Sequence, residues 1–375
     1  MSIGIDYTPA YQQSGGIGRY ARELITALAA CDSAHDYRLF VAGAARDKLP
    51  PVPAANFRYC PTRLAPLTLA RLWHKARLPL PIELFVGKVQ LFHATDFVLP
   101  PTLPRTRTLL TVHDLSFARL PELAAPRLRA YLESVVPRSA RRADHILADS
   151  AATKADIVAL YNIPEAKITV LYSGVSDAFQ PTCDAAAQSA VRAKYQLGNS
   201  PYVLSVGTVQ PRKNYERLIQ AFAALPLRWS DLKLVIVGGR GWLDAPIYAQ
   251  ARALGERVLF TGFADEADLP ALYSGALCLA FPSLYEGFGL PVLEGMACGV
   301  PVLTSNVSSL PEVAGDAALM VDPYSVEAIR EGLLTLLEED TATRAERIAR
   351  GFAQAKRFTW QAAAQHLKAI YDKLC

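Results

Sequence analysis

Residues 281–297 read Phe-Pro-Ser-Leu-Tyr-Glu-Gly-Phe-Gly-Leu-Pro-Val-Leu-Glu-Gly-Met-Ala, and this stretch decides how the second half of the chain folds. It begins where a short aliphatic strand pattern ends, passes Gly287 and Gly289, and continues as an apolar helix pattern. Glycines in such a turn let backbone N–H groups approach an anion, and the helix N-terminus adds roughly half a positive charge. The pattern therefore predicts a parallel sheet whose carboxyl edge suits a diphosphate.

Two carboxylates belong to the same stretch. Glu286 lies in the loop before the helix and Glu294 follows about two turns later, so both side chains can face one groove at different heights. Together they could bracket a ligand that is rich in hydroxyl groups. Each glutamate taken singly has a plainer interpretation, as an exposed helix residue or as part of a tight turn, and that alternative stays open at this point.

A second loop of the same kind comes earlier in this half. Residues 206–214 read Val-Gly-Thr-Val-Gln-Pro-Arg-Lys-Asn and also connect a strand pattern to a helix pattern. Arg212 can meet phosphate oxygens as a planar fork, and Lys213 can meet them as a point charge. Because two cations on a loop are often only solvated surface, their position at a strand end is what favours a binding role.

Short aliphatic or β-branched runs alternate with helix patterns along the whole chain, which predicts the α/β class with two successive doubly wound parallel sheets. Strands are expected in the first half at residues 2–6, 37–41, 57–60, 90–93, 108–112, 145–148 and 168–171. Strands are expected in the second half at residues 202–206, 232–237, 258–261, 277–281, 300–304 and 318–321. The polar stretch 176–200 between them contains Pro181 and Gly198, and the domain boundary is expected there.

The composition supports two soluble domains. The chain has 375 residues, of which 51% are hydrophobic and 20% are charged, and its net charge of +4 calls for no nucleic-acid partner. Its six cysteines form no Cys-x-x-Cys pair, and no secretory signal pattern precedes Ile3, so we expect reduced thiols and a cytoplasmic location. No apolar run reaches the roughly 18 residues of a membrane span, but the basic, apolar stretch 63–88 suits peripheral contact with an anionic inner membrane face.

The ordered motifs of the chain resemble the retaining nucleotide-sugar glycosyltransferases of family 4. The resemblance is carried by Ser14-Gly15-Gly16-Ile17-Gly18-Arg19, Val112-His113-Asp114, Tyr172-Ser173-Gly174-Val175, residues 207–214, Thr261-Gly262-Phe263, the two glutamates eight residues apart and Leu310-Pro311-Glu312-Val313. It implies the GT-B fold, in which two Rossmann-like doubly wound domains face a central cleft. Residues 1–178 would form the acceptor-side domain and residues 179–358 the donor domain, with a terminal helix at 359–375 returning to the first domain.

The resemblance also implies roles for individual residues. The residues that match catalytic positions are His113, Arg212, Lys213 and Glu286. The residues that match donor-binding positions are Gly15, Gly16, Gly262, Phe263, Phe288, Gly289, Leu290 and Glu294. In these roles Glu286 would engage the donor sugar, Glu294 the ribose, and Arg212 with Lys213 the leaving diphosphate.

Two positions weaken a simple transfer of these roles. Many relatives carry an arginine where this chain has Thr208, so one phosphate-facing cation is missing. An isolated histidine at a strand end is more often structural than catalytic, and Asp114 beside His113 is a candidate for orienting its ring. Only the family resemblance favours a catalytic role for His113.

The predicted function is the retaining transfer of a hexosyl group to a glycan or lipid-linked acceptor in cell-surface polysaccharide synthesis. The variant of residues 207–214 resembles bacterial mannosyltransferases, so GDP-mannose is the first expected donor, and UDP-sugars or dTDP-rhamnose are the alternatives. A sugar-nucleotide epimerase of the same fold is a further alternative. No cofactor and no metal are expected, because the chain has no Asp-x-Asp pair and no close histidine cluster.

Two rivals from other classes remain. Residues 16–21 match Gly-x-Gly-x-x-Ala, the motif of dinucleotide-dependent oxidoreductases, but they come ten residues after Asp6 instead of directly on the turn. The second strand pattern also lacks the acidic residue that would hold a ribose. A non-catalytic nucleotide-sugar binder would be favoured by loss of the cationic pair or of a glutamate, and all four residues are present.

Overall fold

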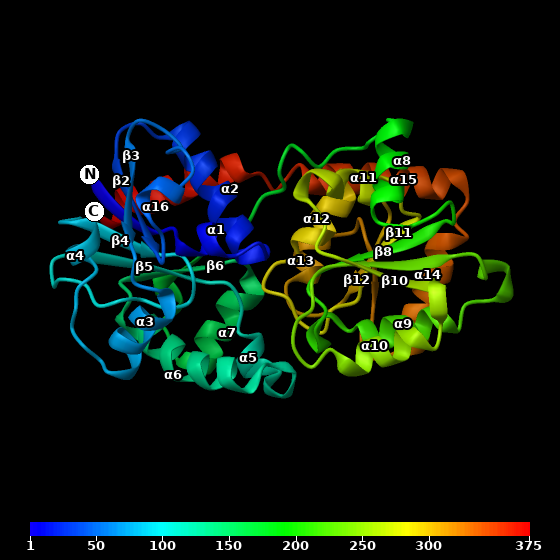
Figure 1. Cartoon of the computed structure of the whole chain (residues 1–375), viewed down its shortest axis with the longest axis horizontal. Helices are drawn as coiled ribbons and strands as arrows, with labels where there is room; N and C mark the ends of the chain where they lie inside the picture. The colour runs from blue at the N-terminus through cyan, green and yellow to red at the C-terminus, as the bar shows by residue number, and fades with distance from the viewer. The chain divides into compact units, whose positions relative to one another are not determined.

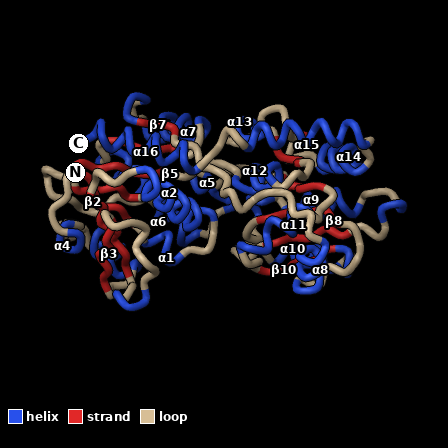
Figure 2. Tube along the Cα trace, turned by 90° about the horizontal axis from the view of Figure 1, so that it is seen from above, coloured by secondary structure: helices blue, strands red, loops and turns tan.

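The computed structural model describes all residues from Met1 to Cys375 and divides the chain into two compact units (Figure 1). Unit 1 comprises Met1–Ala118, Pro126–Gly174 and Trp360–Cys375, and unit 2 comprises Arg119–Ala125 and Val175–Thr359. Each unit is built around one parallel sheet whose strands lie between helices (Figure 2).

Unit 1 contains a seven-stranded sheet in the order β3-β2-β1-β4-β5-β6-β7. Its strands are β1 (Ser2–Asp6), β2 (Asp36–Ala42), β3 (Phe57–Thr62), β4 (Leu91–Ala94), β5 (Arg107–Val112), β6 (His145–Ala148) and β7 (Ile168–Val170). All neighbouring strands pair in parallel. Central strands such as β4 are buried on both faces, which explains why they read as continuous apolar runs.

The helices of unit 1 cover both faces of that sheet. They are α1 (Thr8–Gln12), α2 (Gly16–Cys31), α3 (Pro66–Ala70), α4 (Glu83–Val86), α5 (Ser116–Arg119), α6 (Pro126–Arg142), α7 (Ala151–Tyr161) and the terminal helix α16 (Trp360–Leu374). Helix α16 packs against α2, and the Tyr371 hydroxyl lies 2.8 Å from Nδ1 of His93 on β4. The last helix of the chain is therefore part of the first unit, and both chain ends lie on the same side of it (Figures 1 and 2).

Unit 2 contains a six-stranded parallel sheet in the order β10-β9-β8-β11-β12-β13. Its strands are β8 (Tyr202–Val206), β9 (Lys233–Val237), β10 (Val258–Gly262), β11 (Cys278–Phe281), β12 (Val302–Ser305) and β13 (Leu319–Val321). Its helices are α8 (Ala185–Lys194), α9 (Tyr215–Ala223), α10 (Ala245–Arg252), α11 (Leu269–Ser274), α12 (Leu290–Ala297), α13 (Leu310–Ala314), α14 (Val326–Leu337) and α15 (Thr341–Ala355). Leu204 and Val203 of β8 belong to two different buried clusters, because successive strand residues face opposite sides of the sheet.

The predicted α/β class with two doubly wound parallel sheets is confirmed, and every expected strand is present within two residues of its expected bounds. Two local features differ from expectation. Residues 119–125, which fall inside the expected first domain, belong to unit 2, where Trp242 Nε1 donates to the Leu123 carbonyl at 2.8 Å. The basic stretch 63–88 forms no long helix, because α3 ends in a π-helical turn at Arg71–Lys75 before Pro79 and Pro81 enforce an extended segment.

The strand order of unit 2 indicates where a ligand site is expected. The chain leaves β8 toward β9 on one side, whereas β11 pairs with the other side of β8, so the order reverses between β8 and β11. Loops that leave the carboxyl ends of strands at such a reversal diverge and leave a crevice for ligands. The loops in question are the two that the sequence singled out, residues 207–214 and 282–289.

Candidate active site

The loops after β8 and β11 are joined by hydrogen bonds. The Asn214 side-chain amide donates to the Pro282 carbonyl at 2.9 Å, and the Leu284 amide donates to the Arg212 carbonyl at 2.9 Å. The Arg212 guanidinium also donates to the Tyr285 carbonyl at 2.5 Å. The two sequence-predicted segments therefore form one rigid frame at the carboxyl edge of the sheet.

Glycine is required at two points of this frame. Gly207 has φ +149°, and a Cβ there would lie 3.0 Å from the Lys213 Cε atom. Gly289 has φ +119°, and a Cβ there would lie 2.8 Å from Leu310 Cδ2. These backbone conformations are rare for residues with side chains, so the glycines permit the close approach of both loops.

Glu286 is the centre of the frame. Its carboxylate oxygens lie 2.8 Å from Arg212 Nη1 and 2.7 Å from Lys213 Nζ, and all three side chains are largely buried. The Lys213 ammonium also lies 4.5 Å from the centroid of the Phe281 ring. The structure thus brings together three of the four predicted catalytic residues.

The charges of this cluster do not cancel. Burial alone would raise the pKa of Glu286, but the charges of Arg212 and Lys213 outweigh it and lower that pKa to about 2. Glu286 is therefore ionised at neutral pH, and two cations against one anion leave one positive charge among these three side chains. A buried positive charge at a strand-order reversal can attract a phosphate group.

Helix α12 begins beside this cluster. Gly289 is its N-cap and Leu290 its first residue, so the first-turn amides point out of the loop that holds Phe288. Ser309 Oγ lies 2.9 and 2.7 Å from the carbonyl oxygens of Glu286 and Phe288 and shares its one hydroxyl hydrogen between them, which fixes the loop against the start of α13. The sequence analysis missed Ser309, although a serine directly before Leu310-Pro311 is a helix N-cap signal that could have found it.

Glu294 is not an exposed helix residue, so that alternative is wrong. Its side chain is buried on α12, and one carboxylate oxygen accepts a hydrogen bond from the Tyr273 hydroxyl at 2.6 Å. Tyr273 comes from α11 and was not predicted. Because the Tyr273 hydroxyl holds the buried Glu294 carboxylate in one rotamer, this side chain is rigid.

The predicted base-contact residues lie at the end of β10. Gly262 has φ +73°, and the ring of Phe263 after it is 65% exposed. That ring covers Gly239, where a Cβ would lie 2.2 Å from Phe263 Cε2. An exposed, supported ring at the same sheet edge is a surface on which a planar group can stack.

The predicted glycine loop of unit 1 lies between α1 and α2. A Cβ at Gly15 or Gly16 would meet no atom within 4 Å, so these two residues border open space. Gly18 is the tightly packed one, since a Cβ there would fall 1.9 Å from the Gln13 carbonyl oxygen. The Gln13 side-chain amide donates to Asp96 after β4 at 3.0 Å, which ties the loop to the sheet edge.

His113 lies at the end of β5 with both ring nitrogens engaged inside unit 1. Nδ1 lies 2.8 Å from an Asp149 carboxylate oxygen and Nε2 lies 2.8 Å from the Thr95 carbonyl oxygen. A carbonyl and a carboxylate can only accept, so both nitrogens donate and the ring is an imidazolium. Burial would lower the pKa of His113, but the charge of Asp149 outweighs it and raises that pKa to about 9.

Asp149, and not the neighbouring Asp114, orients this ring. Asp114 instead accepts hydrogen bonds from the Ser116 amide and hydroxyl at 2.9 and 2.8 Å. The sequence analysis missed Asp149, because it follows a different strand, β6, and lies 36 residues away. Its position directly after a predicted strand in a parallel sheet was the signal available.

The fully described chain contains no group of three or more His, Cys, Asp or Glu side chains that could hold a metal ion. All six cysteines are free thiols. None of the helices is both long enough and apolar enough to span a lipid bilayer.

Comparisons with known sequences cover both halves of the chain. The family profile described as Glycosyltransferase Family 4 matches residues 14–179, and the profile described as Glycosyl transferases group 1 matches residues 188–354. O-antigen chain mannosyltransferase B of Escherichia coli is 37% identical over 360 residues, which cover 92% of this chain and 93% of that protein. O-antigen chain mannosyltransferase RfbU of Salmonella typhimurium is 31% identical over 271 residues, 70% of this chain and 68% of that protein.

Comparisons with solved structures extend over the whole chain. Sucrose-phosphate synthase from Thermosynechococcus elongatus superposes with a TM-score of 0.76 at 23% identity and covers 100% of this chain and 99% of that one. WaaG, described as a glycosyltransferase involved in lipopolysaccharide biosynthesis, superposes with a TM-score of 0.74 at 18% identity and covers 99% of each chain. At these identities the likeness shows the fold alone.

The His113–Asp149 pair makes the stability of unit 1 depend on pH. A group whose pKa rises from 6.5 to about 9 on folding contributes stability fully below pH 6.5, and the contribution is lost as pH rises through 9. In Asp149→Asn the ring loses its counter-charge, so we expect a lower melting temperature at pH 6 and a flatter profile between pH 6.5 and 9. Glu165→Gln, on an exposed carboxylate of the same unit, is the control and keeps the wild-type profile. Parallel profiles for wild type and Asp149→Asn in thermal unfolding would contradict the pairing.

Proposed function

We infer that this chain, which belongs to the glycosyltransferases of family 4 and group 1, moves a mannosyl group from GDP-mannose to a glycan or lipid-linked acceptor. The chain is a transferase with the GT-B fold. The Glu286–Arg212–Lys213 cluster at the strand-order reversal of unit 2 carries the proposal, because it concentrates positive charge where a diphosphate is expected. The mannosyltransferase names of similar proteins with O-antigen roles support the choice of sugar and of cell-surface polysaccharide synthesis.

The proposed reaction retains the configuration at the sugar carbon. The bond between the anomeric carbon and the diphosphate oxygen breaks, and its electron pair leaves with the diphosphate. The acceptor hydroxyl oxygen bonds to the same face of that carbon, and its proton passes to the departing phosphate oxygen. The main task of the protein is then to stabilise the growing negative charge on the leaving group.

In this proposal the cluster acts as the leaving-group clamp. Arg212 and Lys213 meet the phosphate oxygens, and the amides of Phe288, Gly289 and Leu290 add the positive end of α12. Glu286 holds both cations in place and engages the donor sugar. Its two ion pairs support this double role, because they fix the carboxylate at the centre of the clamp.

The remaining predicted residues complete donor recognition. The buried Glu294 would bind the ribose hydroxyls, and the exposed Phe263 ring beside Gly262 would contact the base. In unit 1, Gly15 and Gly16 would contribute backbone to the diphosphate, and the open space around both supports that role. His113 would contribute a positive charge near the transferred sugar, because its ring nitrogens are already engaged by Asp149 and Thr95.

Donor identity is tested by a thermal-shift panel together with product analysis. At a concentration of about 100 times its dissociation constant, the true donor stabilises the folded protein by about 2.7 kcal/mol. We expect GDP-mannose to give the largest shift and to yield a mannosylated acceptor. A larger shift with a UDP-sugar or dTDP-rhamnose would overturn the donor. Turnover of the donor without acceptor would instead favour an epimerase.

Glu286→Gln tests the clamp. The substitution keeps the volume but removes the charge that holds Arg212 and Lys213, so kcat should fall by about 10²–10³. Glu294→Ala should act mainly on KM for the donor, if ribose binding is shared by the ground and transition states.

The matched control for both variants is Glu327→Gln. This exposed glutamate of unit 2 pairs with Arg330 outside both donor loops, so its replacement should leave kcat and KM unchanged. Unchanged turnover of Glu286→Gln at saturating donor and acceptor would refute the assignment of Glu286.

The reaction is proposed to need no divalent metal. The clamp and the start of α12 can meet the diphosphate charge directly, and charge-assisted hydrogen bonds contribute about 1.5–3 kcal/mol each. Excess EDTA should therefore leave the rate within about twofold, since no Mg²⁺ bridge to the phosphates is required. Lys213→Ala should not be rescued by added magnesium. A chelated enzyme that Mg²⁺ or Mn²⁺ restores would contradict the clamp.

Residues 63–88 are proposed as the part of unit 1 that contacts an anionic membrane at the cytoplasmic face. Several apolar side chains of the stretch are exposed, namely Leu64, Leu67, Leu78, Leu80 and Leu84. Exposed cations lie in the same stretch, namely Arg63, Arg71, Lys75, Arg77 and Lys88. This mixture suits an interface with anionic lipids. The chain should float with phosphatidylglycerol vesicles at low salt, and absence of flotation there would exclude the contact.

A further inference from the structure

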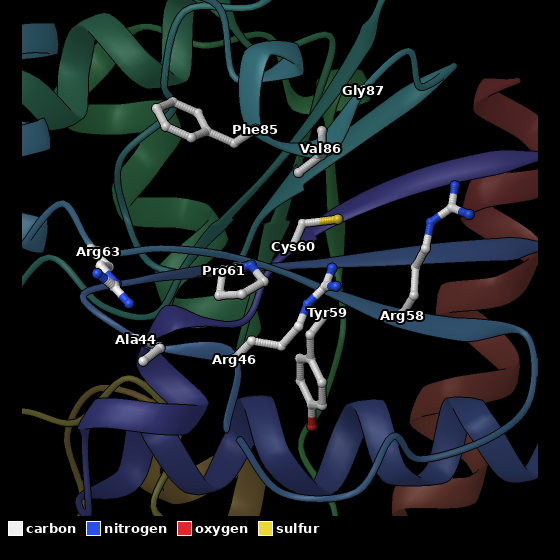
Figure 3. Close-up of a pocket in the computed structure, with 11 residues that line it drawn as sticks. Ala44, Arg46, Arg58, Tyr59, Cys60, Pro61, Arg63, Phe85, Val86 and Gly87 are labelled. Carbon is white, nitrogen blue, oxygen red and sulfur yellow. The ribbon is translucent and has the colours of Figure 1, made fainter. Parts of the chain in front are cut away.

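Unit 1 contains a cavity of about 590 Å³ that none of the proposed donor-binding residues line, although Arg63 and Phe85 of its lining belong to the proposed membrane-contact stretch 63–88 (Figure 3). The edge strand β3 supplies Arg58, Tyr59 and Cys60, the segment after β2 supplies Arg46, and the end of α4 supplies Phe85. Arg63, just beyond β3, completes the set of three lining arginines, and no aspartate or glutamate lines the cavity. The lining is therefore basic and partly aromatic.

Two of the three lining arginines, Arg46 and Arg58, act electrostatically on Cys60, and all three are exposed to solvent. Burial raises the pKa of the Cys60 thiol, while the charges of Arg58, Arg38 and Arg46 all act in the opposite direction. Of these three arginines, Arg58 and Arg46 line the cavity together with Cys60. Figure 3 shows Arg46 and Arg58 on either side of Tyr59, with Arg63 at the opposite end of the strand.

The positive charge of the cavity is only partly compensated by the protein. Asp36 on β2 pairs with Arg58 at 3.1 Å and with Arg38 at 3.3 Å. Arg46 and Arg63 have no carboxylate partner. Two arginines in a concave lining without a counter-ion favour an anionic ligand, because the lining raises the local concentration of anions.

The lining also selects the class of anion. A guanidinium group presents paired donors in a plane, and several such groups around one cavity match a group with three or more oxygens and two charges better than a carboxylate. Tyr59 and Phe85, whose rings are half-buried, also line the cavity. The cavity volume leaves room for carbon-bearing parts attached to the anion.

We propose that this cavity at the β3 edge binds a phosphorylated molecule, whose anionic groups are met by Arg46, Arg58 and Arg63. The same phosphate chemistry is available from a phospholipid headgroup and from a soluble phosphoester or diphosphate. The site lies apart from the donor loops of unit 2 in sequence and belongs to a different sheet. It does not depend on the identity of the donor.

Cys60 makes the site measurable without an activity assay. The other thiols with any exposure are Cys31, Cys183 and Cys375, whereas Cys278 and Cys298 are buried. Replacing the three exposed or half-exposed thiols by serine leaves Cys60 as the reporter. Its rate of reaction with an uncharged maleimide is then measured with and without inorganic pyrophosphate, at ionic strength matched with sodium chloride.

We expect saturating pyrophosphate to slow the labelling of Cys60 at least about tenfold at matched ionic strength, since a bound anion covers the lining. Arg46→Gln combined with Arg63→Gln should abolish the protection. Arg105→Gln, on an exposed arginine of unit 1 outside the cavity, should keep it. Thermal unfolding reports whether the variants keep the fold, because Arg46 itself acts on the pKa of Cys60, and protection is compared with each variant's own labelling rate without anion.

Vesicles distinguish the two sources of phosphate. Protection by phosphatidylglycerol vesicles but not by phosphatidylcholine vesicles, lost in the double variant, identifies a lipid headgroup. Protection by pyrophosphate alone identifies a soluble phosphorylated ligand. Absence of protection by both, or protection that the double variant retains, would overturn the proposal and leave the donor clamp unaffected.

Discussion

A buried carboxylate between two cations is the constraint on which the candidate site depends. Glu286 comes from the loop after β11, whereas Arg212 and Lys213 come from the loop after β8, so one ion cluster joins the two strand ends at the reversal of the sheet. Burying three charges costs folding free energy unless each charge is paired. Removing one member of the cluster leaves a buried charge without its partner, which destabilises the folded state. The cluster therefore stabilises the loops only as a complete set, and the set has a net positive charge that a diphosphate can share.

The fold and the centre of the site were predictable because they follow from local rules. Strand patterns and the parallel class place the loops after β8 and β11 at one edge, which is enough to bring Arg212 and Glu286 together. Tyr273 and Asp149 could not be predicted in the same way. Each is the hydrogen-bonding partner of a predicted residue but comes from another element. Only the packing of that element determines which of its side chains contacts the predicted residue. The burial of Glu294 could not be predicted either, because the periodicity of a short helix does not determine which of its sides faces solvent.

Each unit holds buried ion pairs at the carboxyl ends of its parallel strands. In unit 2 an anion, Glu286, is held by two cations, and in unit 1 a cation, the His113 imidazolium, is held by Asp149. Both lie at the carboxyl ends of parallel strands, where backbone amides and helix starts are available to support them. The resemblance matched His113 to a catalytic position and predicted nothing about its ring nitrogens. The geometry instead makes His113 a fixed positive charge, because Thr95 and Asp149 accept from both of its nitrogens.

The threonine at position 208 explains why the clamp has two cations and not three. Residues after β9 fill the space beside it, and a Cβ at Gly241 would lie 2.9 Å from Thr208 Cγ2. Arg240, on the same turn, is no substitute, because it pairs with Asp244 at 3.0 Å and stacks 5.0 Å from the centroid of the Tyr248 ring. In the proposed clamp, the charge that would face a diphosphate thus falls on Arg212, Lys213 and the start of α12. With one cation fewer, the orientation of the remaining two matters more, and Glu286 supplies that orientation through both of its oxygens.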